Sequence, residues 1–175
     1  MNLKLAAVTI VLLGVFSRLL PHPPNFSPIT ALALFGGAYL PKKFAFLPLL
    51  ALLISDFFIG FYGIDMLYVY GSFGLVGLIG LWLKNNKKPI LVISSALSSS
   101  VLFFLITNFG VWAPPNNWYP YTFAGLMQSY TLAIPFFRNT LLGDLVWTVS
   151  LFGGYELVQI WGKKYLPQTI VKLVF

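Results

Sequence analysis

The sequence has no cysteine, one histidine and only four acidic residues among 175. The absence of cysteine excludes disulfides, thiolate metal sites and cysteine nucleophiles. Charged residues make up 9% of the chain and hydrophobic residues 58%, whereas an ordinary soluble domain is about 25% charged. This composition argues against a water-soluble fold and predicts an integral membrane protein with a single domain, residues 1–175.

Several motifs of enzymes and of nucleic-acid-binding proteins are also missing. The sequence contains no glycine-rich phosphate loop, no His-Glu-x-x-His and no Gly-x-Ser-x-Gly, so we expect neither enzymatic activity nor a cofactor. The formal net charge of +7 could indicate nucleic acid, but the lysines lie beside apolar runs instead of on one basic face with interleaved aromatic residues. We therefore expect the lysines to contact the lipid bilayer, and we expect no nucleic-acid partner.

Six apolar stretches have the composition of transmembrane helices, which need about 20 residues to cross a bilayer core of about 30 Å. They cover residues 3–20, 28–40, 44–61, 66–83, 89–109 and 139–162. Their pattern is helical or continuous and lacks the alternation of a membrane barrel, so the expected fold is all-α. A further segment, residues 121–135, is interrupted by Gln128, Ser129 and Pro135. We expect it to form a short surface or re-entrant helix before the last span.

The distribution of Lys and Arg predicts the orientation of these six spans. If the N-terminus is inside, nine of the eleven basic residues fall on the cytoplasmic side, which are Lys4, Lys42, Lys43, Lys84, Lys87, Lys88, Lys163, Lys164 and Lys172. A seventh span over residues 121–137 would reduce this excess to six against five. The positive-inside rule therefore favours six spans with both termini in the cytoplasm, in a multi-pass protein of a bacterial inner membrane.

With this topology, the polar residues gather on the outer side of the membrane. They lie in three loops, residues 18–28, 56–65 and 108–139. Ionisable groups below the lipid headgroups cost about 2.5–3.5 kcal/mol each and normally pair, line water or serve a function. Arg18, Asp56 and Asp144 lie at that depth near the outer ends of their helices. They could converge in one binding pocket or form an ion-pair cluster that holds three helices together, and the sequence leaves both readings open.

Other outer residues are weaker candidates for ligand binding. Arg138 and Asn139 open the expected last helix, whose free N–H groups could bind an anionic or carbonyl-bearing ligand, although Asn139 could simply cap the helix. His22 lies between prolines, and a single histidine does not make a metal site, so none is predicted. Trp112 follows Asn108 at the expected mouth and could stack on a flat ring.

Five segments resemble an uncharacterised family of small bacterial inner-membrane proteins. They are Arg18–Ile29, Ala33–Ala38, Ser55-Asp56, Thr107–Trp112 and Ile134–Asp144. That family is similar in turn to the S components of energy-coupling-factor transporters, six-helix proteins with both termini inside and a vitamin or metal site near the outer face. The resemblance implies a substrate-binding subunit for uptake of a small nutrient, with a transmembrane coupling subunit and its ATPases as candidate partners.

By this resemblance the ligand-binding residues lie in the three outer loops and next to them. They are Arg18, His22, Asn25, Asp56, Asn108, Trp112, Arg138, Asn139 and Asp144. Many S components dock on the coupling subunit through small residues spaced by four in the first helix, but here Ala6 is followed by Ile10 and Ala7 by Val11. Docking therefore stays open. The alternative function is that of a structural or accessory subunit of a larger membrane complex, with the outer loops as protein contacts.

Overall fold

The structure, a computed structural model, describes residues 3–116 and 118–165, and every regular element in this part of the chain is helical. The elements are α1 (Leu3–Leu19), α2 (Ile29–Tyr39), the 3-10 turn η1 (Lys42–Phe44), α3 (Leu47–Ile59), α4 (Asp65–Leu83), α5 (Pro89–Trp112), α6 (Phe123–Thr148), the π-helical turn η2 (Val149–Gly153) and α7 (Gly154–Tyr165). The all-α prediction is confirmed for the described residues.

Three stretches are long and apolar enough to cross a membrane, namely α4, α5 and the continuous run Phe123–Gly162. The apolar helices α1, α2 and α3 are shorter. With 11 residues, α2 is about 16 Å long, roughly half the thickness of a bilayer core. Every residue from Ile29 to Ala38 is buried, which is typical of a helix that is apolar on all sides. The other helices therefore surround α2, and it forms the centre of the bundle.

Close backbone contact holds α2 against α4. A Cβ atom on Gly37 would lie 2.4 Å from the carbonyl carbon of Gly80, and a Cβ atom on Gly80 would lie 2.6 Å from the carbonyl oxygen of Ala33. Only glycine fits at these two positions. In lipid, where apolar burial does not drive helices together, such small-residue contacts let the backbones gain van der Waals packing.

A similar contact joins α1 to α3. A Cβ atom on Gly14 would lie 2.6 Å from the Cβ atom of Ala51, so this face of α1 packs inside the chain. Val8, Leu12 and Phe16 are exposed on the rest of the helix. At Gly14, the small-residue face of α1 is therefore already covered by α3.

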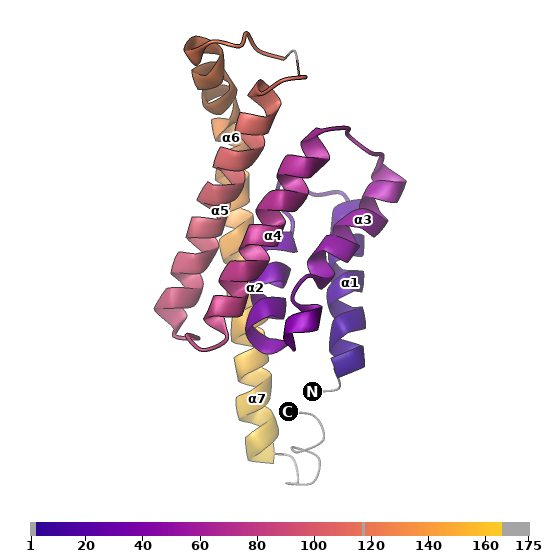
Figure 1. Cartoon of the computed structure of the whole chain (residues 1–175). Helices are drawn as coiled ribbons and strands as arrows, with labels where there is room; N and C mark the ends of the chain where they lie inside the picture. The colour runs from indigo at the N-terminus through magenta and orange to yellow at the C-terminus, as the bar shows by residue number, and fades with distance from the viewer. Residues whose placement is uncertain (1–2, 117, 166–175) are drawn as a thin grey trace.

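The separate short helix expected over residues 121–135 is not present, and that prediction was wrong. Helix α6 begins at Phe123, passes through Pro135 without a break and continues through η2 into α7. Thr122 caps its N-terminus by accepting a hydrogen bond from the Gly125 N–H at 3.2 Å. A proline removes one backbone hydrogen bond, but a membrane helix tolerates this where its neighbours satisfy the freed carbonyl. The first turns of α6 and the last turns of α5 project beyond the other helices (Figure 1).

The two ends of the bundle differ in charge. The start of α1 and the end of α7 lie at the same end of the molecule, together with the loops that follow α2 and α4 (Figure 1). We call this end the lysine end, because these loops carry Lys42, Lys84, Lys87 and Lys88. The end of α1, whose last turn carries Arg18, and the loops after α1, α3 and α5 lie at the opposite end. Lys172, which was assigned to the cytoplasm from the sequence, lies outside the described residues.

Candidate functional site

A cavity of about 280 Å³ lies at the end of the bundle opposite the lysines. We call it the Arg18 cavity. Each helix from α1 to α6 contributes to its wall. The lining residues are Arg18, His22, Asn25, Ser27, Ile29, Thr30, Leu52, Tyr62, Val69, Phe73, Phe103, Thr140 and Asp144. Segments that are far apart in the sequence thus meet around one space, and most of the polar side chains among them belong to the loops and helix ends of this half of the bundle.

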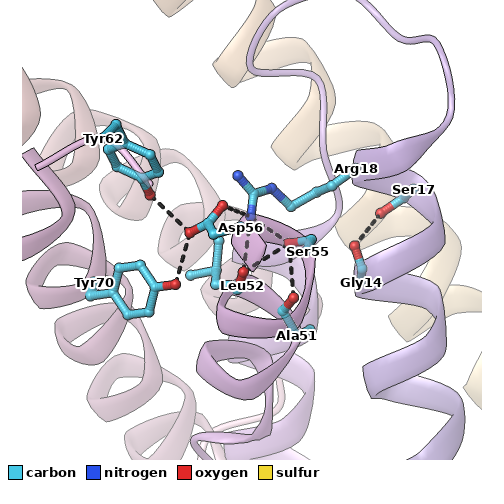
Figure 2. A network of polar contacts seen from close by, with 9 residues as sticks. All are labelled: Gly14, Ser17, Arg18, Ala51, Leu52, Ser55, Asp56, Tyr62 and Tyr70. Carbon is cyan, nitrogen blue, oxygen red and sulfur yellow. Dashed lines mark hydrogen bonds and ion pairs between the residues drawn. The ribbon is translucent and has the colours of Figure 1, made fainter. Parts of the chain in front are cut away.

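Arg18 is held in the wall by three contacts to α3, all made by its Nη1 atom (Figure 2). This nitrogen lies 2.6 Å from Asp56 Oδ1, donates to Ser55 Oγ at 2.6 Å and donates to the Leu52 carbonyl oxygen at 3.4 Å. The Asp56 side chain is fully buried and that of Arg18 is 17% exposed. The ion pair therefore joins α1 to α3 and leaves the guanidinium at the cavity surface.

The second carboxylate oxygen of Asp56 accepts hydrogen bonds from two phenols. Tyr70 donates to Oδ2 at 2.7 Å and Tyr62 at 3.2 Å, and both rings point at the carboxylate in Figure 2. Tyr62 lies in the loop between α3 and α4. Burial raises the pKa of the Tyr62 phenol above its ordinary value of 10.0, and the negative charge of Asp56 adds to the effect. The phenol therefore stays protonated at neutral pH and donates a hydrogen bond to Asp56.

Asp144 lies elsewhere in the wall and has a different environment. Its side chain is almost completely buried, with 2% exposure, and its Oδ2 atom accepts a hydrogen bond from Ser100 Oγ on α5 at 2.6 Å. The Thr30 hydroxyl on α2 is a second neighbour of the carboxyl group. Within the described part of the chain, the partners of Asp144 are hydroxyl groups and not basic side chains. A carboxyl group in this setting can accept a hydrogen bond from a ligand or pair with a ligand cation.

The two readings left open by the sequence each apply to part of the charged set. Arg18 and Asp56 form an ion pair that connects two helices, as in the structural reading. Asp144 does not join that pair, but it shares the cavity with Arg18, as in the binding reading. The wall also has an apolar part formed by Phe73 and Phe103, whose ring centroids are 4.9 Å apart. The cavity thus presents a cation, a carboxyl group and aromatic surface to anything that enters it.

A family of unknown function (DUF6580) matches residues 2–168, a range that contains every residue of the Arg18 cavity. The chain belongs to this family. No curated protein and no solved structure matches the chain. The expected membership of an uncharacterised family is confirmed, and none of these comparisons supports the further likeness to S components.

Five of the nine predicted site residues of this DUF6580 member lie at the cavity or directly behind it. Arg18, His22, Asn25 and Asp144 line it, and Asp56 contacts Arg18 from behind. His22 Nδ1 lies 2.7 Å from the Leu20 carbonyl oxygen. Asn25 has a φ angle of 62°, a left-handed conformation that asparagine adopts more readily than most residues. The contact of His22 and the backbone conformation of Asn25 shape the loop that forms the rim.

The other four predicted residues do not line the cavity. Asn108 Nδ2 donates to the Phe104 carbonyl oxygen at 2.8 Å, and Trp112 Nε1 donates to the Pro120 carbonyl oxygen at 3.0 Å. Arg138 is exposed and Asn139 is half-buried. The expectation that Arg138 and Asn139 open a helix was wrong, because α6 begins at Phe123 and its backbone N–H groups at residues 138 and 139 lie in the helix interior. No helix N-terminus is available there for an anion.

Sequence reasoning missed the partners of the two carboxylates. Ser100 ends a serine-rich run of α5, residues 94–100, and Thr30 lies in an apolar helix. Tyr62 lies in the second outer loop and Tyr70 in the helix that follows it, and aromatic residues are common at a membrane interface for other reasons. The sequence signal for Ser100 is its hydroxyl group in an apolar helix, because a polar group at membrane depth needs a hydrogen-bond partner.

Proposed function

We propose that this chain is a membrane-embedded substrate-binding subunit that takes up a small nutrient and binds it in the Arg18 cavity at the extracytoplasmic face. The observation that carries the proposal is that Arg18 and Asp144, on different helices, line one cavity. Ionisable residues at membrane depth are costly, and they commonly mark substrate or ion pathways.

The cavity favours a small polar organic molecule, similar in character to a vitamin. Its volume of about 280 Å³ is just below the range for ligand pockets, roughly 300–1,000 Å³, which suits a small ligand. Arg18 can donate to a carboxylate or carbonyl oxygen, and Asp144 can accept from an amine, amide or hydroxyl. Phe73 and Phe103 supply an apolar surface for a ring or a short chain. A ligand with a hydrogen-bond acceptor at one end and a donor at the other could pair with both Arg18 and Asp144. A bare metal ion could not pair with Arg18.

The proposal includes a membrane orientation. The lysine end would face the cytoplasm, because basic loops are retained on that side, and the Arg18 cavity would then open outward. The short helices α1, α2 and α3 would complete six spans with α4, α5 and α6, in a bacterial inner membrane. That the start of α1 and the end of α7 lie at one end supports an even number of crossings. The sequence has no nucleotide-binding motif, so an energising partner such as a coupling subunit with ATPases would be separate.

Native mass spectrometry of gently extracted protein tests the binding function, because it weighs the small molecule that accompanies the chain. We expect a bound species in the wild type and its loss in Arg18→Gln and Asp144→Asn. Arg138→Gln and Asp65→Asn are matched controls. Arg138 is exposed, and Asp65, which does not line the cavity, accepts a hydrogen bond of 2.7 Å from Asn116. Equal retention in all five proteins would reject the Arg18 cavity as the site.

A second function, that of a structural or accessory subunit, is favoured by the projecting end of α5 and α6. Trp118 and Phe123 on this projection are 74% and 76% exposed, as residues of a protein contact would be in a chain purified alone. Removing both side chains separates the two functions. If a stoichiometric partner is lost from Trp118→Ser/Phe123→Ser while ligand binding was never detected, the accessory role is the better account.

A further inference from the structure

A second cavity, of about 460 Å³, lies at the lysine end of the bundle. We call it the Lys87 cavity. It lies between the start of α5, the end of α6, η2 and the end of α2, and its inner wall is apolar, with Val92 and Phe152. Its mouth is polar: Tyr39 donates to Glu156 Oε1 at 2.6 Å, and Lys87 Nζ lies 4.7 Å from the centre of the Tyr39 ring. The two cavities therefore belong to opposite ends of the molecule.

Thr148 is the deepest polar residue of the Lys87 cavity. Its side chain is fully buried and lines the cavity, yet its Oγ1 atom has no hydrogen-bond partner among the described residues. A buried hydroxyl without a partner is costly and is retained where water or a ligand can reach it. The position of Thr148 thus points to an occupant of this cavity that offers a polar group.

The helix register shows how close the two cavities are. The hydrogen bond between Ser100 and Asp144 sets these residues at one level of the antiparallel pair α5 and α6. Four residues closer to the lysine end on each helix, Ala96 of α5 and Thr148 of α6 lie at the same level. Asp144 lines the Arg18 cavity and Thr148 lines the Lys87 cavity, and four residues of α-helix rise about 6 Å. Along α6, one helical turn separates the two spaces.

The layer between the cavities includes the small side chain of Ala96 and an exchangeable hydrogen bond. Ala96 is fully buried and ends at its Cβ atom. Ser100 Oγ lies 2.6 Å from Asp144 Oδ2 and 3.0 Å from the Ala96 carbonyl oxygen. A hydroxyl has one proton to donate, so Ser100 can exchange Asp144 for its own helix backbone. The contact that closes this layer can therefore open without leaving the Ser100 donor unpaired.

The helix beside this layer has a place where it can bend. The π-helical turn η2 follows Thr148 directly, and such wide turns are frequent at functional sites and are places where helices kink. Gly153 ends this turn and Gly154 begins α7, and a Cβ atom at either would meet nothing within 4 Å. Below this turn, α7 contacts α2 through the hydrogen bond from Tyr39 to Glu156 and through the ring contacts of Tyr155 with Phe35 and Tyr39.

We propose that the Arg18 and Lys87 cavities are the two halves of one permeation path, closed here by the layer of Asp144, Ser100, Ala96 and Thr148. The chain then passes a small polar organic molecule through itself from one end to the other. The identity of the transported molecule rests on the proposed binding function. The opening of the path does not rest on it, because a water-soluble reagent can probe the path without any ligand.

Cysteine accessibility tests the path, since the chain has no cysteine of its own. Thr148→Cys and Leu97→Cys are each placed in sealed vesicles, and a membrane-impermeant cationic methanethiosulfonate is added to either side. Leu97 is next to Ala96 on α5 but is 38% exposed on the outer surface of the bundle, where lipid would cover it. We expect the thiol of Thr148→Cys to be modified when the reagent is added to either side, and the thiol of Leu97→Cys to remain free in both cases.

Adding Ser100→Ala to Thr148→Cys should raise the modification rate from the Arg18 side roughly two- to tenfold, the range for loss of one hydrogen bond. Modification from the lysine end alone would make the Lys87 cavity a closed pocket and overturn the proposal, as would no modification at all. Ala96→Cys replaces Thr148→Cys if the latter fails to fold. If ligand retention depends on Arg18 and Asp144 while the thiol is reached from one side only, the binding function stands and the path is rejected.

Discussion

Replacing Arg18 with methionine should destabilise the protein through the carboxylate that it leaves behind. Methionine keeps most of the length of the side chain but removes its charge. Asp56 would remain fully buried, with hydrogen bonds from Tyr62 and Tyr70 but no cation. Losing one partner of a buried ion pair costs about 3–5 kcal/mol, mainly because the other charge stays buried without compensation.

The two phenols and the partial exposure of Arg18 set the expected magnitude. Hydrogen bonds to a charged group contribute about 1.5–3 kcal/mol each, and those of Tyr62 and Tyr70 survive the substitution. The loss should therefore be near the lower limit, about 3 kcal/mol. For a chain of this size 1 kcal/mol corresponds to roughly 2–4 °C in Tm, so Arg18→Met should lower Tm by about 6–12 °C.

A double-mutant cycle in detergent measures this effect. Thermal unfolding is followed by tryptophan fluorescence for the wild type, Arg18→Met, Asp56→Asn and the double variant. Because the double variant buries no unpaired charge, we expect it to be more stable than Arg18→Met. An Arg18→Met protein as stable as the wild type, or a double variant with the summed loss of both single ones, would refute the assignment of Asp56 as a buried partner of Arg18.

Three further predictions follow from individual contacts. Gly80→Leu should prevent the approach of α2 and α4 and abolish the folded monomer in size-exclusion chromatography, whereas Gly74→Leu, where a Cβ atom meets nothing within 4 Å, should leave it intact. Ser100→Ala should cost about 1–3 kcal/mol of stability by removing a donor from Asp144, while Ser99→Ala, equally buried but without a partner to lose, should cost less than half as much in the same melt. The pKa of Tyr62 is raised above 10.0, so the stabilisation from its protonated phenol is complete below pH 10 and is lost as the pH rises through the folded-state pKa. The Tm of the wild type should therefore fall above pH 10, and Tyr62→Phe should make this fall less steep. An unchanged slope in Tyr62→Phe would contradict the burial of this group.

The long apolar helices were predictable from the sequence because hydropathy alone defines them. The expected spans 66–83 and 89–109 agree closely with α4 and α5. The start of α6 was missed, because Gln128, Ser129 and Pro135 resemble a break in the hydropathy. Ser129 instead lies 3.2 Å from the Asn108 carbonyl oxygen of α5. A polar residue that is satisfied by a neighbouring helix leaves no trace in the local sequence.

The candidate site was predictable in its charged residues but not in its neighbours. The cost of ionised groups in a membrane singled out Arg18, Asp56 and Asp144, and the structure gives each of them a partner. Which of them pair depends on helix packing: Arg18 lies opposite Asp56 because Gly14 lets α1 approach α3. Trp112 and Asn108 were placed at the mouth from their position in a loop, but α5 extends to Trp112 and directs both into contacts of their own.

The central claim is that the Arg18 cavity faces the outside of the cell and the lysine end faces the cytoplasm. Single cysteines test it directly, with His22→Cys at the rim of the cavity and Asn85→Cys in the exposed loop after α4. In intact cells an impermeant thiol reagent should modify His22→Cys at once and Asn85→Cys only after the membrane is permeabilised. Modification of Asn85→Cys in intact cells, with His22→Cys protected, would turn the cavity toward the cytoplasm and contradict uptake through it.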